Sequence, residues 1–531
     1  MRTRTRTRRT LVTALVAVAL TLAACKGTPP KASAAADATF TYANNLTVMT
    51  SWDPAASYSN EVIAMNNIYE QLTRYDSTTG KVVPLLADSW SSSSNGLTWT
   101  FKLHPGVTFS DGNRLDAAAA KAALDRTIKL GAGAAYEWDS VRSIQAKGPT
   151  TLVFHLKYAA PLDLIASSAY AAFIYDTKAA PSGDLAQWFA AGHAAGSGPY
   201  VVSDYQKGQE NELTLTANKT YWGGWKGAHY TSVDFRVVPQ ETTAAQLLQG
   251  GQVTFVPRLS PTLFNSLKGA KGITTEQTPS FQNILAMLNT ASGPLADPRV
   301  RRAISDAIDY DGIATALKGA VVKAQGVVPK GLLGYTTGVS QTTDAAQAQS
   351  LLDAAGYGAG GKELSLTLTY ASGTPELDTI VSLMKSNLAK VGVTLNAKAL
   401  AWETQWALGK SSDPSKHQDI FLFYWYPDYA DPFSWFVNLY RSASPVVFNL
   451  SYWHDAQVDR AIDGIQALTA THRAAAQRQY EQLQKTISEQ AVSPVLGVDN
   501  FQRAFSSSVG GYVDNPSYSN VVFVHDLTPT S

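Results

Sequence analysis

The segment 419–436 carries the densest group of side chains that could bind a ligand or do chemistry in this chain. Its sequence is DIFLFYWYPDYADPFSWF. The continuous apolar and aromatic run 420–426 predicts a strand buried on both faces, and Pro427 ends it. Asp428 then lies at the carboxyl end of this strand, the edge at which open α/β sheets bind ligands. An enclosed carboxylate is costly until a cation pairs with it, so Asp428 is a candidate for ligand contact.

Aromatic residues near this segment and elsewhere are further candidates for the wall of a ligand cleft. These residues are Trp425, Tyr426, Tyr429, Phe281, Trp402 and Tyr58. Ordinary packing is the alternative for each of them, and a turn before the next residue is the alternative for Asp428. Phe421 and Phe423 are expected in the core, and Asp431 is expected to cap a helix or turn the chain.

The chain lacks the local patterns of an enzyme or a metal site. Gly356, Gly358 and Gly361 fit G-x-G-x-x-G, but they follow a predicted helix and precede a strand, the reverse of a dinucleotide site, so we expect a loop. A near match to a phosphate loop fails because Glu363 replaces the Ser or Thr that the motif needs. Neither H-E-x-x-H nor G-x-S-x-G occurs, and the eight histidines are scattered. We therefore expect no catalytic residues, no cofactor and no protein metal site; nickel carried by a small organic chelator remains open as a solute.

The elements that must position these residues describe an α/β protein. Turn signals at Asn95-Gly96 and Gly148-Pro149 predict two hairpins. The predicted strands are 39–48, 97–103, 152–156, 364–370, 393–400 and 420–426. The predicted helices are 116–130, 298–308, 344–355, 374–392 and 471–490. Strand 364–370, the following helix and strand 393–400 form a βαβ unit, which calls for a parallel sheet. Arg299, Arg301 and Arg302 are expected on a solvated helix face.

Cys25, the single cysteine of the chain, ends a segment that looks like an export signal. Five arginines come first, the apolar run 11–22 follows, and small residues lead to the cysteine. The run is too short to span a bilayer, which needs about 20 residues. Because 22–25 (LAAC) resembles a bacterial lipobox, we expect a signal peptide at 1–24 and lipid on Cys25. A buried structural cysteine is the alternative, and export by the general or the twin-arginine route stays open.

The charge and length of the remaining chain exclude some classes of protein. Removing 1–24 removes five arginines and no acidic residue, which changes the formal charge from +1 to −4. Nucleic-acid binders carry basic patches, so we expect no nucleic-acid partner. The body is too long for one simple domain, and two or three lobes are expected. Residues 25–36 are predicted to be a flexible, lipid-anchored tether on the extracytoplasmic face of the cell membrane.

Several segments, in this order, resemble a known family. They are NIYEQL at 67–72, YD at 75–76, TG at 79–80, PLLA at 84–87, SW at 89–90, GLTWTF at 96–101, GVTFSDG at 106–112, GSGPY at 196–200, the stretches 297–309 and 348–357, and DYADP at 428–432. Together they are similar to the large extracytoplasmic solute-binding proteins of peptide and nickel ABC importers, solute-binding protein family 5. The resemblance covers nearly the whole chain after the tether.

The resemblance implies an α/β, two-lobed periplasmic-binding-protein-like fold of type II, with mixed sheets in each lobe and an extra inserted domain. Lobe I would consist of 37–63, 193–280 and 493–531, the inserted domain of 64–192, and lobe II of 281–492. The lobes would close over the ligand. The stretches 196–199 and 279–281 are candidates for crossings near the hinge.

The resemblance also implies the function and its main residue. Peptide-binding members use an aspartate at the position that matches Asp428 to hold the α-ammonium group of the peptide. Dipeptide-specific members place an arginine after the strand that matches 364–370, whereas this chain has ASGT at 371–374, which favours longer peptides or another amine-bearing solute. The expected partners are a small-molecule or peptide ligand and the transmembrane subunits of an ABC permease with their ATPase, and the chain is expected to be a monomer. The alternatives are a secreted, membrane-anchored hydrolase and a sensor that presents its ligand to a receptor; a nickel chelate or a sugar also stays open as the solute.

Overall fold

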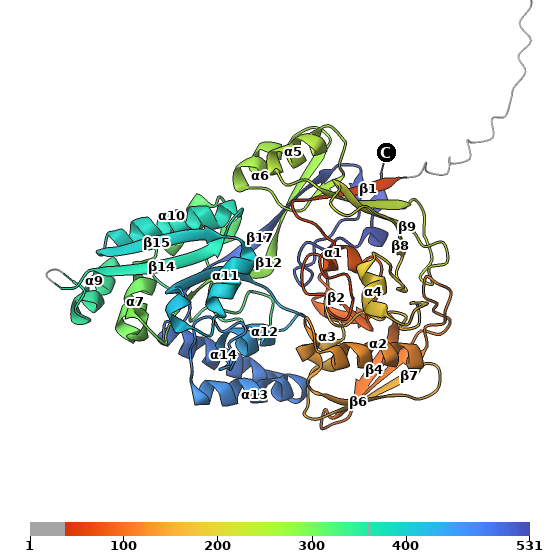
Figure 1. Cartoon of the computed structure of the whole chain (residues 1–531), viewed down its shortest axis with the longest axis horizontal. Coiled ribbons are helices and arrows are strands. Elements are labelled where there is room, and N and C mark those ends of the chain that lie inside the picture. Colours follow the sequence, from red (N-terminus) through yellow and green to blue (C-terminus); the bar gives the residue numbers. More distant parts are fainter. Residues whose placement is uncertain (1–37, 359–360, 531) are drawn as a thin grey trace, which may run out of the picture. The chain divides into compact units, whose positions relative to one another are not determined.

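An eleven-stranded mixed sheet runs through the part of the chain that the computed structural model describes, residues 38–358 and 361–530. Two long antiparallel strands, β12 (Ile273–Leu288) and β17 (Val495–Ser506), lie side by side in its middle (Figure 1). The strands on one side of this pair are β16 (Ile420–Trp425), β14 (Leu364–Ala371) and β15 (Val393–Leu400). Those on the other side are β11 (Phe255–Val256), β1 (Thr39–Asn44), β10 (Ser232–Val237), β9 (Asn211–Ala217) and β8 (Tyr200–Tyr205), while β13 (Val321–Val322) pairs with β17. The two mixed halves expected from the sequence are therefore continuous through β12 and β17.

The predicted βαβ unit is confirmed on one side of this sheet. Strands β14 and β15 are parallel over their whole length, and α10 (Pro375–Ala389) connects them. β14 is also parallel to β16, whereas β12 is antiparallel to β16. β16 is thus an inner strand, and Phe421 and Phe423 are fully buried on it, as predicted. Inner position explains why its sequence is a continuous apolar run instead of an alternating one.

A separate four-stranded antiparallel sheet follows early in the chain. Its strands, in spatial order, are β4 (Ala87–Ser92), β5 (Thr98–Leu103), β7 (Thr151–Leu156) and β6 (Val141–Ala146). Gly96 adopts a positive φ of 66° in the first hairpin, which confirms the predicted turn. Helix α2 (Ala117–Leu130) packs on β6 and β7, and Asp116 caps it by accepting two backbone N–H groups. The short strands β2 (Thr73–Asp76) and β3 (Lys81–Pro84) form a further pair.

The remaining helices lie between strands in the sequence. They are α1 (Val62–Met65), α3 (Leu162–Ile165), α4 (Leu185–Ala190), α5 (Glu241–Gln249), α6 (Pro261–Leu267), α7 (Pro298–Ala307), α8 (Tyr310–Ala316), α9 (Ala345–Ala354), α11 (Trp402–Gly409), α12 (Phe433–Trp435), α13 (Ala456–Thr471) and α14 (Arg473–Glu489). The predicted helix at 471–490 corresponds to α14. α13 packs against it and was not predicted. Gly356 follows α9 with a φ of 85°, so the G-x-G-x-x-G stretch begins as the expected loop.

One prediction about α7 is wrong. Arg301 is 4% exposed and donates hydrogen bonds to the carbonyl oxygens of Leu295, Ala296 and Gln490 at 2.9, 3.1 and 3.1 Å, so it does not lie on a solvated face. Those carbonyls come from a turn before α7 and from the end of α14, where backbone oxygens lack helical partners. A guanidinium group supplies several donors in a fixed fork, which suits this position.

The first 37 residues lie outside the described part of the chain. The predicted signal peptide, Cys25 and most of the tether therefore remain predictions. Among the described residues, no helix has the length and apolar character that a membrane crossing requires.

Candidate functional site

Asp428 lies three residues beyond the end of β16 and is 4% exposed. The strand places it at the carboxyl edge of β14 and β16, the edge expected to bind ligands. Its backbone oxygen accepts a hydrogen bond from Ser168 Oγ at 3.0 Å. The buried aspartate is thus held at the end of a rigid inner strand.

The carboxylate of Asp428 meets residues that are distant in sequence. Tyr136, in the short 3-10 helix Ala135–Trp138, donates its hydroxyl proton to Oδ2 of Asp428. Asn438 Nδ2 donates to the same tyrosine oxygen at 3.1 Å. Tyr136 therefore links the region that follows α2 to the region that follows β16.

A second carboxylate, that of Glu137, is enclosed beside Asp428. Glu137 is 3% exposed, and its Oε1 lies 3.0 Å from Ser168 Oγ. Its Oε2 has no hydrogen-bond partner. No Lys, Arg or His side chain within the described residues forms an ion pair with either acid. Two neighbouring carboxylates are thus buried, and neither has a cationic partner among the described residues.

Burial raises the pKa of both acids. Burial raises the pKa of Asp428 to about 7, and the hydrogen bond from Tyr136 offsets part of the rise. Burial also raises the pKa of Glu137 well above its usual range, and the negative charge of Asp428 adds to the effect. The cause is the loss of water around groups that prefer to be charged in solution. A cationic group of a ligand would reverse both effects.

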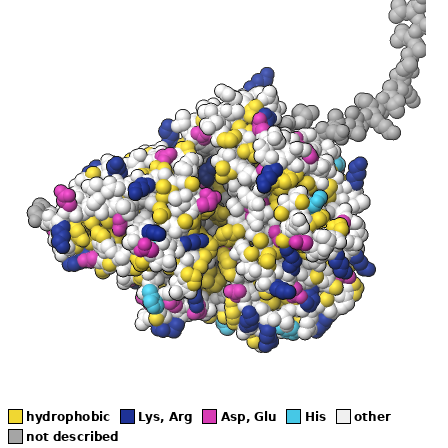
Figure 2. All heavy atoms as spheres, viewed as in Figure 1, with side chains coloured by type: hydrophobic (Ala, Val, Ile, Leu, Met, Phe, Trp, Pro, Cys, Tyr) yellow, Lys and Arg dark blue, Asp and Glu magenta, His cyan; other side chains and the backbone are white. Residues whose placement is uncertain are grey.

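Tyrosine rings form a wall beside the two acids. The ring centroids of Tyr58 and Tyr170 are 5.7 Å apart, and those of Tyr170 and Tyr426 are 6.4 Å apart. Tyr58 also packs on Phe448, at 6.1 Å between centroids. The face in view in Figure 2 has a hollow lined mainly by hydrophobic side chains, between α11 and α12 on one side and α1 and β2 on the other. Electron-rich ring faces attract cations, so the wall and the acids favour the same kind of ligand group.

Tyr58 and Tyr426, both predicted as cleft residues, lie in the group around Asp428. The negative charge of Asp428 contributes to the raised pKa of both tyrosines, after burial as the main cause for each. Their role in binding stays a prediction.

Phe281 and Trp402 are two further residues that were predicted for the cleft wall. Phe281 packs against Tyr75, at 6.3 Å between ring centroids. Trp402 is 48% exposed, and its ring partner, 5.2 Å away, is Trp406. Trp406 in turn packs on Phe448, at 5.6 Å between ring centroids, and Phe448 also contacts Tyr58.

Trp425 and Tyr429 are buried on either side of the turn that contains Asp428. Trp425 packs on Phe448 at 5.3 Å, and the hydroxyl oxygen of Tyr429 accepts a hydrogen bond from Gln466 Nε2 at 3.3 Å. Asp431 turns the chain, as predicted, because its carboxylate accepts the backbone N–H two residues on at 3.0 Å.

Sequence reasoning missed the residues that approach Asp428 from the other side: Tyr136, Glu137, Ser168 and Tyr170. One signal could have found the first two. The stretch YEWD at 136–139 combines aromatic and acidic residues a few positions after the predicted helix 116–130, and the stretch 425–431 does so at the end of its strand.

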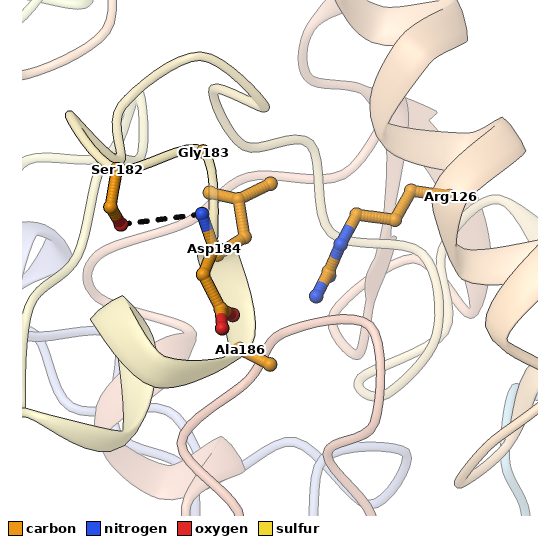
Figure 3. Close-up of a pocket in the computed structure, with 6 residues that line it drawn as sticks. Arg126, Ser182, Gly183, Asp184 and Ala186 are labelled. Carbon is orange, nitrogen blue, oxygen red and sulfur yellow. Dashed lines mark hydrogen bonds between the residues drawn. The ribbon is translucent and has the colours of Figure 1, made fainter.

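A cavity of about 640 Å³ lies elsewhere, beside Arg126 and the loop 182–186 (Figure 3). Both of its charged side chains interact with other groups of the protein. Arg126 pairs with Asp53 at 2.5 Å and donates to the hydroxyl oxygen of Tyr175 at 3.2 Å. Asp184 caps α4 by accepting the N–H of Gln187 at 3.0 Å. The arginine charge is thus paired within the protein, whereas Asp184 is held only by its cap hydrogen bond. No group of three or more His, Cys, Asp or Glu residues suited to a metal ion occurs in the ranges that the structure describes.

Comparisons with known proteins agree on one family. A family model described as bacterial extracellular solute-binding proteins, family 5 middle, matches residues 81–445. The probable D,D-dipeptide-binding periplasmic protein DdpA of Escherichia coli (strain K12) is 28% identical over 488 residues, which cover 90% of this chain and 92% of that protein.

Solved structures show the same fold. NikA from Brucella suis, in complex with Fe(III)-EDTA, superposes with a TM-score of 0.82 at 23% identity and covers 93% of this chain and 100% of its own. The periplasmic binding protein DppA from Helicobacter pylori, in complex with the peptide STSA, has a TM-score of 0.78 at 22% identity and covers 93% of this chain and 98% of its own. The fold class predicted from the sequence is thereby confirmed.

Proposed function

Because the chain belongs to family 5 of the bacterial extracellular solute-binding proteins, we propose that it captures a peptide or a related amine-bearing solute between two lobes and delivers it to an ABC import permease. One observation carries the ligand class. Asp428 and Glu137 are buried together, and no cation of the described chain pairs with either. The ammonium group of a solute would supply the missing charge.

Family membership confirms the predicted solute-binding role and the expectation that the chain is not an enzyme. The alternative of a secreted hydrolase is set aside. The ligand class is supported by the name of DdpA, which refers to a dipeptide. The end of β14 and the residues after it are Ala371, Ser372 and Gly373, with no cation for a ligand carboxylate, so we propose peptides longer than two residues or another amine-bearing solute.

The remaining parts of the proposal concern location and architecture. We propose that lipid on Cys25 holds the chain on the extracytoplasmic face of the cell membrane, where it works as a monomer with the permease subunits and their ATPase. The separate sheet β4–β7 supports an inserted domain at 64–192. The long strands β12 and β17 support crossings between lobe I (37–63, 193–280 and 493–531) and lobe II (281–492).

Titration calorimetry with a free and an N-acetylated form of one peptide tests the role of Asp428. Asp428→Asn keeps the shape of the side chain and an acceptor for Tyr136. It removes the negative charge, so affinity for the free peptide should fall by roughly ten- to a hundredfold, which corresponds to about 1.5–3 kcal/mol. Acetylation should weaken the wild type strongly and the variant little. Asp88→Asn, at an exposed position, is the matched control and should bind as the wild type does.

Equal effects of acetylation on the wild type and on Asp428→Asn would contradict the proposal. An aspartate that only forms a turn would give a different result again. The variant would then lose stability while its folded fraction bound the free peptide as before.

A further inference from the structure

We infer that Glu137 and Asp428 form a single cation subsite that takes the end of a solute bearing two positive charges, such as a peptide whose first residue has a side-chain amine. The inference rests on the proposed role of Asp428 and narrows the ligand class. It assigns Glu137 as a second residue that determines specificity.

The first argument is the small number of hydrogen bonds that the two acids receive. Tyr136 donates one to Asp428, and Ser168 Oγ lies 3.0 Å from both Glu137 Oε1 and the backbone oxygen of Asp428. A hydroxyl has one proton, so Ser168 serves only one of these two acceptors at a time. Oε2 of Glu137 has no donor at all. A carboxylate can accept about four hydrogen bonds, so most of the accepting capacity of this pair is left for a ligand.

The second argument is how the same chain treats its other buried acids. Asp514 receives the guanidinium group of Arg503 at 2.8 and 3.3 Å. Glu70 accepts from three side-chain donors, Ser197, Tyr221 and Trp222, at 2.7, 2.9 and 2.7 Å. Buried acids in native proteins are generally paired or fully hydrogen-bonded. Glu137 departs from this pattern, as does Oδ2 of Asp431, but Glu137 shares Ser168 with a second buried acid that also lacks a cation. This arrangement points to a partner that arrives from outside.

The third argument is the balance of charge. One ammonium group pairs with one carboxylate, and the other acid must then either keep a costly unpaired charge or stay protonated, in which case it forms no ion pair with the ligand. Two cationic groups neutralise both. The rings of Tyr58, Tyr170 and Tyr426 stand beside the pair and favour cations without adding charge. The class of ligand that matches this subsite is therefore a solute with two positive charges at one end.

Peptides that differ only in the first side chain test the inference. Tripeptides that begin with ornithine or lysine are compared with those that begin with norvaline or norleucine, by calorimetry at pH 7. The wild-type protein should bind the basic peptides roughly ten- to a hundredfold more tightly. Glu137→Gln should reduce this preference to within about threefold and still bind free peptides better than acetylated ones. Glu363→Gln, at an exposed position, is the matched control and should keep the full preference.

A second measurement uses the wild-type protein alone and does not depend on the folding of a variant. A dication should drive ionisation of both acids, so a basic peptide should release more protons on binding than its apolar counterpart. Calorimetry in phosphate and in Tris buffer measures this release from the difference in apparent enthalpy.

The outcomes separate the inference from the proposed function. Equal affinity of the wild type for basic and apolar peptides, equal proton release, or an undiminished preference in Glu137→Gln each overturns the dicationic subsite. If acetylation affects the wild type in the same experiment, the role of Asp428 survives. If acetylation has no effect on any peptide, the proposed function fails as well.

Discussion

Replacing Asp428 by Asn should stabilise the unliganded protein, and the gain should depend on pH. Asn keeps an oxygen that accepts the hydroxyl proton of Tyr136, so the contact seen in the structure can persist. The pKa of Asp428 rises from 3.8 to about 7 because the side chain is buried. Because the folded state disfavours the charged carboxylate, the free energy of unfolding falls once the pH rises above the pKa of this side chain in the unfolded chain.

The sign and size of the effect follow from this pKa. Between pH 4 and pH 7 the unfolded chain loses the proton of Asp428 while the folded chain retains it, so stability falls as pH rises and the loss is complete above pH 7. The interval between 3.8 and about 7 corresponds to about 4 kcal/mol as an upper limit. Unfolding a chain of about 500 residues carries an entropy of about 1 kcal/mol per kelvin, so the difference in Tm should be at most about 4 °C.

Differential scanning calorimetry of the unliganded wild type, Asp428→Asn and the exposed control Asp88→Asn measures the effect. At pH 8, Asp428→Asn should unfold above the wild type, by up to about 4 °C. At pH 4 the two should agree, and Asp88→Asn should match the wild type at both pH values. A constant difference across this range, or a wild type that is the more stable protein at pH 8, would refute the reasoning.

Two further predictions concern packing and anchoring. Gly196→Ala should destabilise the fold by several kcal/mol in urea unfolding, because a Cβ there would lie 2.0 Å from a backbone carbonyl oxygen. The control Gly464→Ala, in α13 with open space around it, should be neutral or stabilising by up to about 1 kcal/mol. Equal effects of the two substitutions would show that the close approach at Gly196 is not tight. Cys25→Ser should release the protein from the membrane fraction or leave it unprocessed, and unchanged membrane attachment with normal processing would rule out the lipid anchor.

Local patterns predicted those parts of the fold whose cause is local. The apolar run of β16 is an inner strand, and β14, α10 and β15 form the expected unit. Each of these depends on periodicity and turn residues within one short stretch. Arg301 was misplaced because its partners include a carbonyl oxygen 189 positions away, at Gln490. The periodicity of a helix does not predict a hydrogen-bond partner that is so distant in the sequence.

Only the part of the candidate site that has a local cause in the sequence could be predicted. Asp428 stood out because it follows a buried strand, which is a local signal. Tyr136 meets it from 292 positions earlier in the sequence, and Glu137 and Ser168 accompany that contact. No spacing rule joins these segments, because the sheet topology and the position of the second sheet bring them together.

The two acidic clusters near β16 differ in one respect that decides what each can bind. Glu376 and Asp499 lie 3.7 and 3.8 Å from the guanidinium group of Arg258, which also donates to the hydroxyl of Tyr424 in β16 at 3.0 Å. A cation that approached these acids would compete with a charge the protein already supplies. The pair formed by Asp428 and its neighbouring glutamate has no such competitor among the described residues. Both clusters lie near the carboxyl end of β16, but an incoming ammonium group would meet acids without a cation only at Asp428 and its neighbour. We therefore propose that a cationic solute is recognised at Asp428 and not beside Tyr424.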